Sequence, residues 1–140
     1  MEERSAVIPE GHSKPVGRYS PGVSVRTGAA ARWVFVSGQV AVDARGSLVG
    51  PGDAGRQAIE VFARIEQVLA QARGKLSDLV SLVIYLVNIG DFPAVSAVRN
   101  RVLREPAPSS TLVVVSRLVE TGCLVEISGV ALITPAERYG

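Results

Sequence analysis

Residues 79–95 read LVSLVIYLVNIGDFPAV and combine a strand, a turn and the beginning of a helix. The segment 79–87 is almost entirely apolar and rich in β-branched residues, which is typical of a strand buried on both faces. Asn88 to Asp91 form a turn, and Asp91 is a favourable N-cap for a helix that extends to about Leu103. Pro93 falls in the first turn of this helix, where its missing N–H costs little. The stretch therefore predicts a buried strand that passes directly into a helix.

The flanking segments continue this alternation in both directions. Asp53 is a plausible N-cap for a long helix that ends near Arg73, and Gly74 suits a left-handed C-cap. An apolar stripe along this helix is formed by Ile59, Phe62, Ile65, Leu69 and Ala72. Further strands are expected at 23–26, 33–37, 111–118 and 124–133. The order β-β-α-β-α-β-β predicts an α+β fold, a single mixed sheet with two helices packed on one face.

The composition describes an ordinary globular chain. Its 140 residues are 47% hydrophobic and 20% charged, which fits one domain over 1–140 with an irregular lead-in over 1–18. The net charge of +2 is scattered, so nucleic acid is not an expected partner. The longest apolar stretch is too short to span a bilayer, and the charged N-terminus lacks the apolar core of a signal peptide. We therefore expect no membrane partner and a cytoplasmic location.

The chain offers few residues for metal or cofactor chemistry. One cysteine and one histidine exclude an internal disulfide and an ordinary zinc site. Glycines between 46 and 55 lack the spacing and the lysine of a phosphate-binding loop. Cys123 is expected to be a packing residue, and His12 is expected to be exposed to solvent. We therefore expect no metal and no cofactor.

One strand pattern points to a partner subunit. The run 112–115 reads LVVV and lacks the alternation expected of a strand with one solvated face. A single sheet with helices on one face leaves its second face uncovered. We therefore expect another subunit to cover that face.

Four segments carry a resemblance to a known family. They are Tyr19-Ser20-Pro21, Phe35-Val36-Ser37-Gly38-Gln39-Val40, Asp91-Phe92-Pro93-Ala94-Val95 and Val125-Glu126-Ile127. In order and spacing they resemble the Rid (YjgF-like) family of small imine and enamine hydrolases, from about Tyr19 to Leu132. The resemblance implies a Rid/chorismate-mutase-like fold and a homotrimer with active sites in clefts between subunits.

The resemblance also implies roles for particular residues. Glu126 resembles the glutamate that holds or activates water, although an outward-facing solvated carboxylate is the alternative. Tyr19 matches the tyrosine that closes one side of the substrate cleft, or it simply covers the core. Ser37 and Gly38 match residues that line the pocket, and they also fit an ordinary transition from strand to turn.

The family's substrate-binding arginine is missing. Hydrolytic members have arginine in a Pro-Ala-Arg-Ser/Thr run, whereas residues 106–111 read PAPSST, which places Ser109 or Pro108 at that position. Ser96 stands where many relatives have asparagine, and Thr111 stands where they have cysteine or threonine. We take Ser96, Ser109 and Thr111 as candidate substrate-binding residues. Neither Ser109 nor Pro108 can bind a carboxylate by charge.

These residues leave three interpretations open, of which the last is a purely structural trimer without a ligand pocket. The first is a Rid-like enzyme that hydrolyses or otherwise transforms an imine or enamine other than a simple 2-imino acid, with Glu126 and Tyr19 as the catalytic candidates. A tailoring step in specialised metabolism is a variant of this reading. The second is a trimer that binds a ligand or a protein partner without catalysis, and the sequence does not decide whether the chain is an enzyme.

Overall fold

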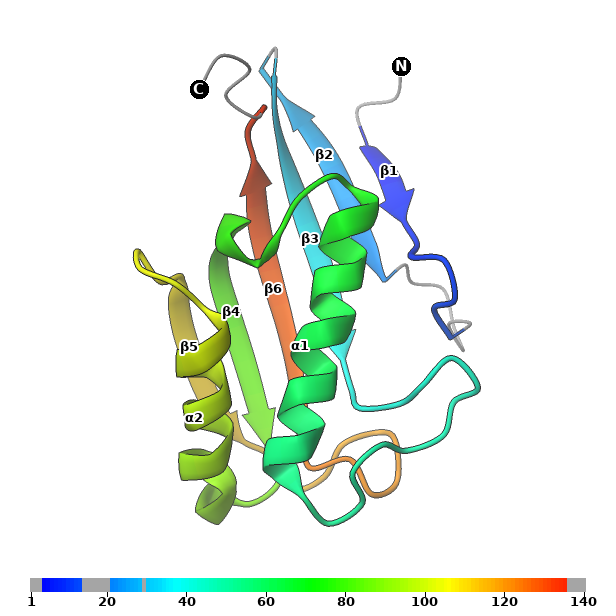
Figure 1. Cartoon of the computed structure of the whole chain (residues 1–140), viewed down its shortest axis with the longest axis vertical. Helices are drawn as coiled ribbons and strands as arrows, with labels where there is room; N and C mark the ends of the chain where they lie inside the picture. Colours follow the sequence, from blue (N-terminus) through cyan, green and yellow to red (C-terminus); the bar gives the residue numbers. More distant parts are fainter. Residues whose placement is uncertain (1–3, 14–20, 29, 136–140) are drawn as a thin grey trace.

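The computed structural model describes residues 4–13, 21–28 and 30–135. They form one six-stranded mixed sheet with both helices on the same face (Figure 1). The strand order is β1-β2-β3-β6-β4-β5; only β4 and β5 run parallel, and every other neighbouring pair is antiparallel. This arrangement confirms the predicted fold class. The elements are β1 (Arg4–Val7), β2 (Gly22–Thr27), β3 (Ala31–Gln39), α1 (Ala54–Gln71), β4 (Leu79–Leu86), α2 (Phe92–Val102), β5 (Ser109–Val114) and β6 (Val125–Ile133).

The N-terminal lead-in is more ordered than predicted. Residues 4–7 were expected to be irregular, but they form β1, which pairs antiparallel with β2 at the edge of the sheet. Four residues are too few to show a periodic pattern, so the pairing with β2 decides their conformation. The prediction that His12 is exposed is also wrong, because its imidazole is half-buried and Nε2 lies 3.1 Å from Oε1 of Gln39. The rest of the predicted lead-in, residues 14–18, lies outside the described residues.

Helix α1 begins as predicted and ends differently. The Asp53 carboxylate accepts a hydrogen bond from the Arg56 N–H at 2.9 Å, as an N-cap should. At the other end Arg73, and not Gly74, adopts a left-handed conformation, with φ 67°. A Cβ on Gly74 would lie 2.4 Å from Cδ1 of Ile133. Gly74 is therefore needed for the close approach of β6, and the prediction of a glycine C-cap is wrong.

The apolar face of α1 is shifted from the predicted stripe. Ile59 is 45% exposed, whereas Arg64 is buried. The guanidinium of Arg64 donates to the carbonyl of Val42 and, at 3.2 Å, to Oγ of Ser13. A buried arginine is tolerated here because neighbouring oxygens bind its N–H groups. The core side of the helix is formed by Ala58, Val61, Phe62, Ile65, Val68 and Leu69.

Helix α2 follows a short 3₁₀ turn, Ile89–Asp91. Asp91 occupies the N-cap position but makes no side-chain capping bond. The side-chain cap lies at the 3₁₀ turn, where Oδ1 of Asn88 accepts from the Gly90 N–H at 2.9 Å. Helix α2 thus starts where the sequence predicted, but without the predicted capping bond from Asp91.

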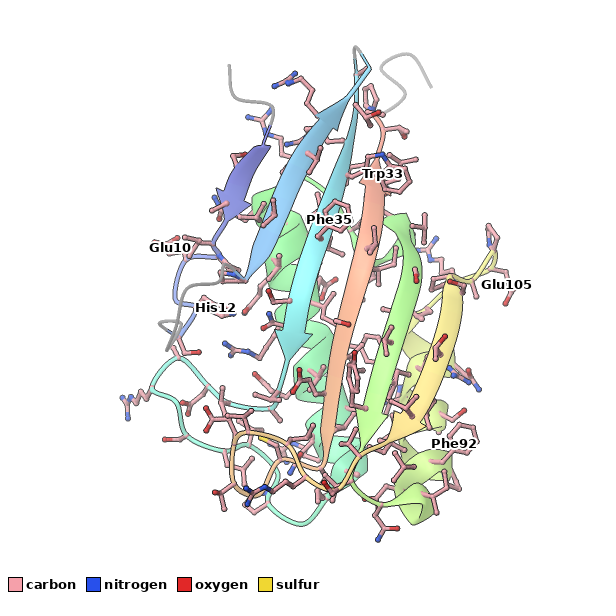
Figure 2. All side chains as sticks on the ribbon, turned by 180° about the vertical axis from the view of Figure 1, so that it is seen from behind. Glu10, His12, Trp33, Phe35, Phe92 and Glu105 are labelled. Carbon is pink, nitrogen blue, oxygen red and sulfur yellow. The ribbon has the colours of Figure 1, made fainter. Side chains whose placement is uncertain are left out.

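Strand β6 shows how the two faces of the sheet differ. Val125, Ile127, Ala131 and Ile133 are buried toward the helices, whereas Glu126, Ser128, Val130 and Leu132 alternate with them and are half-buried on the helix-free face. Strand β4 alternates in the same way, so within one chain it is not buried on both faces. Trp33 and Phe35 also lie on the helix-free face (Figure 2). That face is therefore apolar and is left uncovered by the chain's own helices.

A buried glutamine ties α1 to the segment that leads into β6. The Gln57 side chain is fully buried, and its amide nitrogen donates to the carbonyls of Gly50 and Gly122, both at 3.1 Å. Its amide oxygen accepts from the Leu124 N–H at 2.8 Å. One side chain thus provides hydrogen-bond partners for three backbone groups that lie outside the helices and strands.

We expect Gln57→Leu to destabilise the fold by about 3 kcal/mol, because two carbonyls and one N–H lose their partner in a buried place. Urea denaturation at a fixed protein concentration measures the change. Gln67→Leu on the exposed side of the same helix is the control and should change the free energy of unfolding much less. Equal effects of the two substitutions would show that the Gln57 bonds do not stabilise the fold.

Candidate active site

Glu126 lies on the helix-free face, near the start of β6. Its side chain is half-buried, and burial raises the pKa of its carboxyl group above the ordinary value. The carboxylate is thus neither fully solvated nor fully enclosed within one chain. A carboxylate with a raised pKa can take up and release a proton closer to neutral pH.

Gly38 makes room for this carboxylate. The register between β3 and β6 shifts between Val36 and Gln39, so Ser37 and Gly38 form an irregular step in the ladder. A Cβ at Gly38 would lie 2.0 Å from Oε2 of Glu126. A larger residue at position 38 would therefore have to displace the Glu126 carboxylate, a contact that the sequence could not reveal. The structure brings Ser37, Gly38 and Glu126 together.

The backbone of Ser37 is already engaged. Its N–H donates to the carbonyl of Pro21 at 2.9 Å, and its carbonyl accepts from Nε2 of Gln39 at 3.2 Å. These bonds hold the bulge in place. They also mean that the Ser37 N–H is not free to receive a ligand carboxylate.

Tyr85 is a neighbour of Glu126 that the sequence analysis missed. The two residues are partners in the antiparallel pairing of β4 and β6, so their side chains leave the same face about 5 Å apart at Cβ. Val83 and Ser128 form the next pair on this face. Tyr85 is the one aromatic residue in the otherwise aliphatic and serine-containing strand β4, and this contrast was the available signal.

Ser109 and Thr111 lie away from Glu126 within one chain. Ser109 pairs with Ser81 at the start of β5, and its hydroxyl donates to the carbonyl of Val80 at 3.3 Å. Tyr85 pairs with both Val113 and Glu126. Four residues along β5 and two strand spacings therefore separate Ser109 from Glu126, which is about 16 Å.

Ser96 belongs to a different group, on the helix side of the sheet. Its Oγ accepts from Nη2 of Arg99 at 3.0 Å, and Nη1 of Arg99 lies 3.4 Å from Oγ of Ser110. Ser110 pairs with Leu82, whose side chain is buried under the helices, so both point to the helix side. The sequence-predicted site residues that the structure describes therefore lie in three places within one chain. Ser37, Gly38 and Glu126 lie together, Ser109 and Thr111 lie further away on the same face in β5, and Ser96 lies on the helix side.

The remaining candidates differ in outcome. Tyr19 lies outside the described residues, so its predicted role stays a prediction. Cys123 is buried, and this burial, together with the smaller effect of nearby Glu120, raises the pKa of its thiol, which supports a packing role.

Among the described residues, no three His, Cys, Asp or Glu side chains come together to hold a metal. None of the helices in that part of the chain has the length and apolar character to cross a membrane.

The chain is a small α+β protein with two helices behind one mixed sheet. On the open face of this sheet a half-buried glutamate lies beside a glycine bulge. Residues 11–133 match the profile of the family described as Endoribonuclease L-PSP, and the chain belongs to this family, which confirms the predicted Rid (YjgF-like) membership.

Relatives with names support the same conclusion. The chain is 32% identical over 128 residues to the 3-aminoacrylate deaminase RutC of Acinetobacter baylyi, covering 91% of this chain and 97% of that protein. It is 29% identical over 120 residues to a 2-iminobutanoate/2-iminopropanoate deaminase of Dermatophagoides farinae, covering 86% and 89%. Among solved structures, RidA from an Antarctic Psychrobacter superimposes with a TM-score of 0.79 at 29% identity, covering 92% of this chain and 99% of that one.

We expect Glu126→Gln to stabilise the protein at about pH 8 and to lose this advantage toward about pH 4. Burial raises the folded-state pKa of Glu126 above the ordinary 4.5, so the ionised form costs folding free energy. Below the unfolded-state pKa both states are protonated and the cost of the ionised form vanishes. This cost grows as pH rises through the folded-state pKa.

Urea denaturation across this pH range, at a fixed protein concentration, measures the difference in stability between wild type and Glu126→Gln. Glu66→Gln, exposed on α1, is the control. A stability gain for Glu126→Gln that is independent of pH would contradict the raised pKa.

Proposed function

We propose that this chain is a deaminase that hydrolyses the C=N bond of a small imine or enamine, with Glu126 as its acid–base residue. The observation that carries the proposal is the position of the Glu126 carboxylate, half-buried on the helix-free face and fitted against Gly38. Two named relatives, the RutC protein and the 2-iminobutanoate deaminase, are deaminases of this reaction class.

The reaction needs one base that later acts as an acid. The Glu126 carboxylate removes a proton from water as the water oxygen bonds to the imine carbon, and the C=N electron pair takes up a proton at nitrogen. The resulting carbinolamine then loses ammonia as its C–O bond becomes C=O. Overall, one imine and one water give one carbonyl compound and one ammonia. An enamine enters the same path after protonation at carbon.

The helix-free face supports assembly of the chain into a homotrimer with clefts between its subunits. Phe35 is 45% exposed and Val113 is 39% exposed on this face. A hollow of about 190 Å³ on it is lined by residues that include Phe35, Val83 and Val130. Burying such apolar surface against a second copy is favourable by about 25 cal/mol per Å².

The alternative is a trimer that binds a ligand without catalysis. Full exposure of Glu126 on the outer sheet would have favoured this alternative, and half-burial favours the enzyme. The sequence-based prediction that the substrate is not a simple 2-imino acid rests on the missing arginine at positions 108 and 109.

We expect the wild-type protein to accelerate ammonia release from freshly generated 2-iminopropionate or from a neutral enamine, because Glu126 activates water. Glu126→Gln should lower the rate about 100-fold or more, the usual contribution of a positioned base. A coupled ammonia assay measures both rates.

Gly38→Ala gives a second, independent variant for the same assay. Its added Cβ displaces the carboxylate without removing its charge, so the rate should fall while the protein stays folded. Wild-type rates no higher than those of Glu126→Gln with both substrates would overturn the deaminase proposal and favour the binding protein.

A further inference from the structure

Arg99, in the last turn of α2, is held by neutral partners. Its Nη2 donates to Oγ of Ser96 at 3.0 Å, its Nη1 lies 3.4 Å from Oγ of Ser110, and its Nε lies 3.3 Å from Oδ1 of Asn100. Two hydroxyls and one amide thus orient the guanidinium plane between the helix and the edge strand β5. Three of its five N–H donors are used in these bonds.

The charge of this guanidinium is not neutralised. Among the residues that the structure describes, no carboxylate lies within 4.0 Å of the Arg99 nitrogens, and the one ion pair found there joins Arg64 and Glu60. Glu105 is the one acidic residue among those that line the same cavity, and it is exposed. A half-buried cation with spare donors and no acidic partner is suited to bind an anion.

Arg99 also faces an open cavity. The cavity has a volume of about 350 Å³ and is lined by Arg99, Asn100, Leu103, Ala107, Pro108 and Ser110, together with Glu105. It lies where α2 ends and the chain enters β5, the end of the strand at which Glu105 is marked in Figure 2. Its size admits a small organic acid.

The cavity includes the segment that lacks the expected arginine. Pro108 is one of the two positions at which arginine was expected, and Ser110 directly follows the other. Arg99 therefore brings a guanidinium from the helix to the segment whose own residues have none. Ser96, a predicted substrate-binding residue, acts here through Arg99 as a positioning residue.

We propose that Arg99 is the carboxylate-binding residue of this chain and that its ligands are small 2-imino or enamino acids and their 2-oxo acid products. The identity of the reacting group rests on the proposed deaminase function, whereas the anion site does not. The guanidinium binds the carboxylate through two parallel N–H···O bonds. Within one chain Arg99 and Glu126 lie on opposite sides of the sheet, so one ligand reaches both only where two subunits meet.

Direct binding of pyruvate to the full chain tests the site without catalysis. We expect isothermal titration to show saturable binding that Arg99→Gln weakens about tenfold or more, because the charged fork is lost. Arg101→Gln removes the same charge from the exposed side of the same helix turn and should leave binding unchanged. Pyruvamide, which lacks the carboxylate, should not compete.

Two further variants keep the test decisive if Arg99→Gln is poorly folded. Arg99→Lys keeps the charge but loses the planar fork, so we expect intermediate binding. Glu105→Gln removes the acidic group of the cavity and should tighten binding. Equal pyruvate binding by wild type and Arg99→Gln, or none by wild type, would overturn the site.

The two proposals fail separately in these experiments. Ammonia release that depends on Glu126, together with pyruvate binding that ignores Arg99, would leave the deaminase standing without the arginine site. Pyruvate binding that depends on Arg99, without ammonia release, would leave an anion-binding protein that is not a deaminase.

Discussion

The side chains of strand β6 alternate between the two faces of the sheet, and the side chains on both faces must pack. This alternation sends Val125, Ile127 and Ala131 under the helices and sends Glu126 and Val130 to a face that no helix covers. The two helices of the described residues cover one face of the sheet. The other face exposes apolar side chains, and among the residues that the structure describes it carries the one carboxylate whose pKa is raised by burial alone. Packing and chemistry therefore depend on the same surface.

The contact between Gly38 and Glu126 links the position of the β3 backbone to the pKa of a carboxyl group. The bulge between Val36 and Gln39 brings the β3 backbone close to the carboxylate and excludes water from one side of it. Removal of water disfavours the charged form, which is the direction a base needs in order to act near neutral pH.

Sequence patterns predicted most of the fold and part of the site. The long helix, the position of a strand at 79–86 and the mixed sheet followed from apolar patterns and capping residues, because these signals are local. β1, the left-handed Arg73 and the capping role of Asn88 were missed, because pairing partners and turn geometry select them. Glu126 and Gly38 were identified through the family resemblance, while their mutual contact was visible only in three dimensions. Arg99 was missed because its role depends on two hydroxyls from different elements, Ser96 and Ser110.

The proposed active site is shared between subunits, with Glu126 from one subunit and Arg99 from its neighbour. The most direct test is to co-assemble Glu126→Gln chains with Arg99→Gln chains and to measure ammonia release from 2-iminopropionate at a substrate concentration at which each variant alone has little activity. In randomly mixed trimers about one quarter of the clefts receive an intact residue from each side, so the mixture should recover about a quarter of wild-type activity. A mixture no more active than the two variants kept apart would show that the site is not shared between subunits.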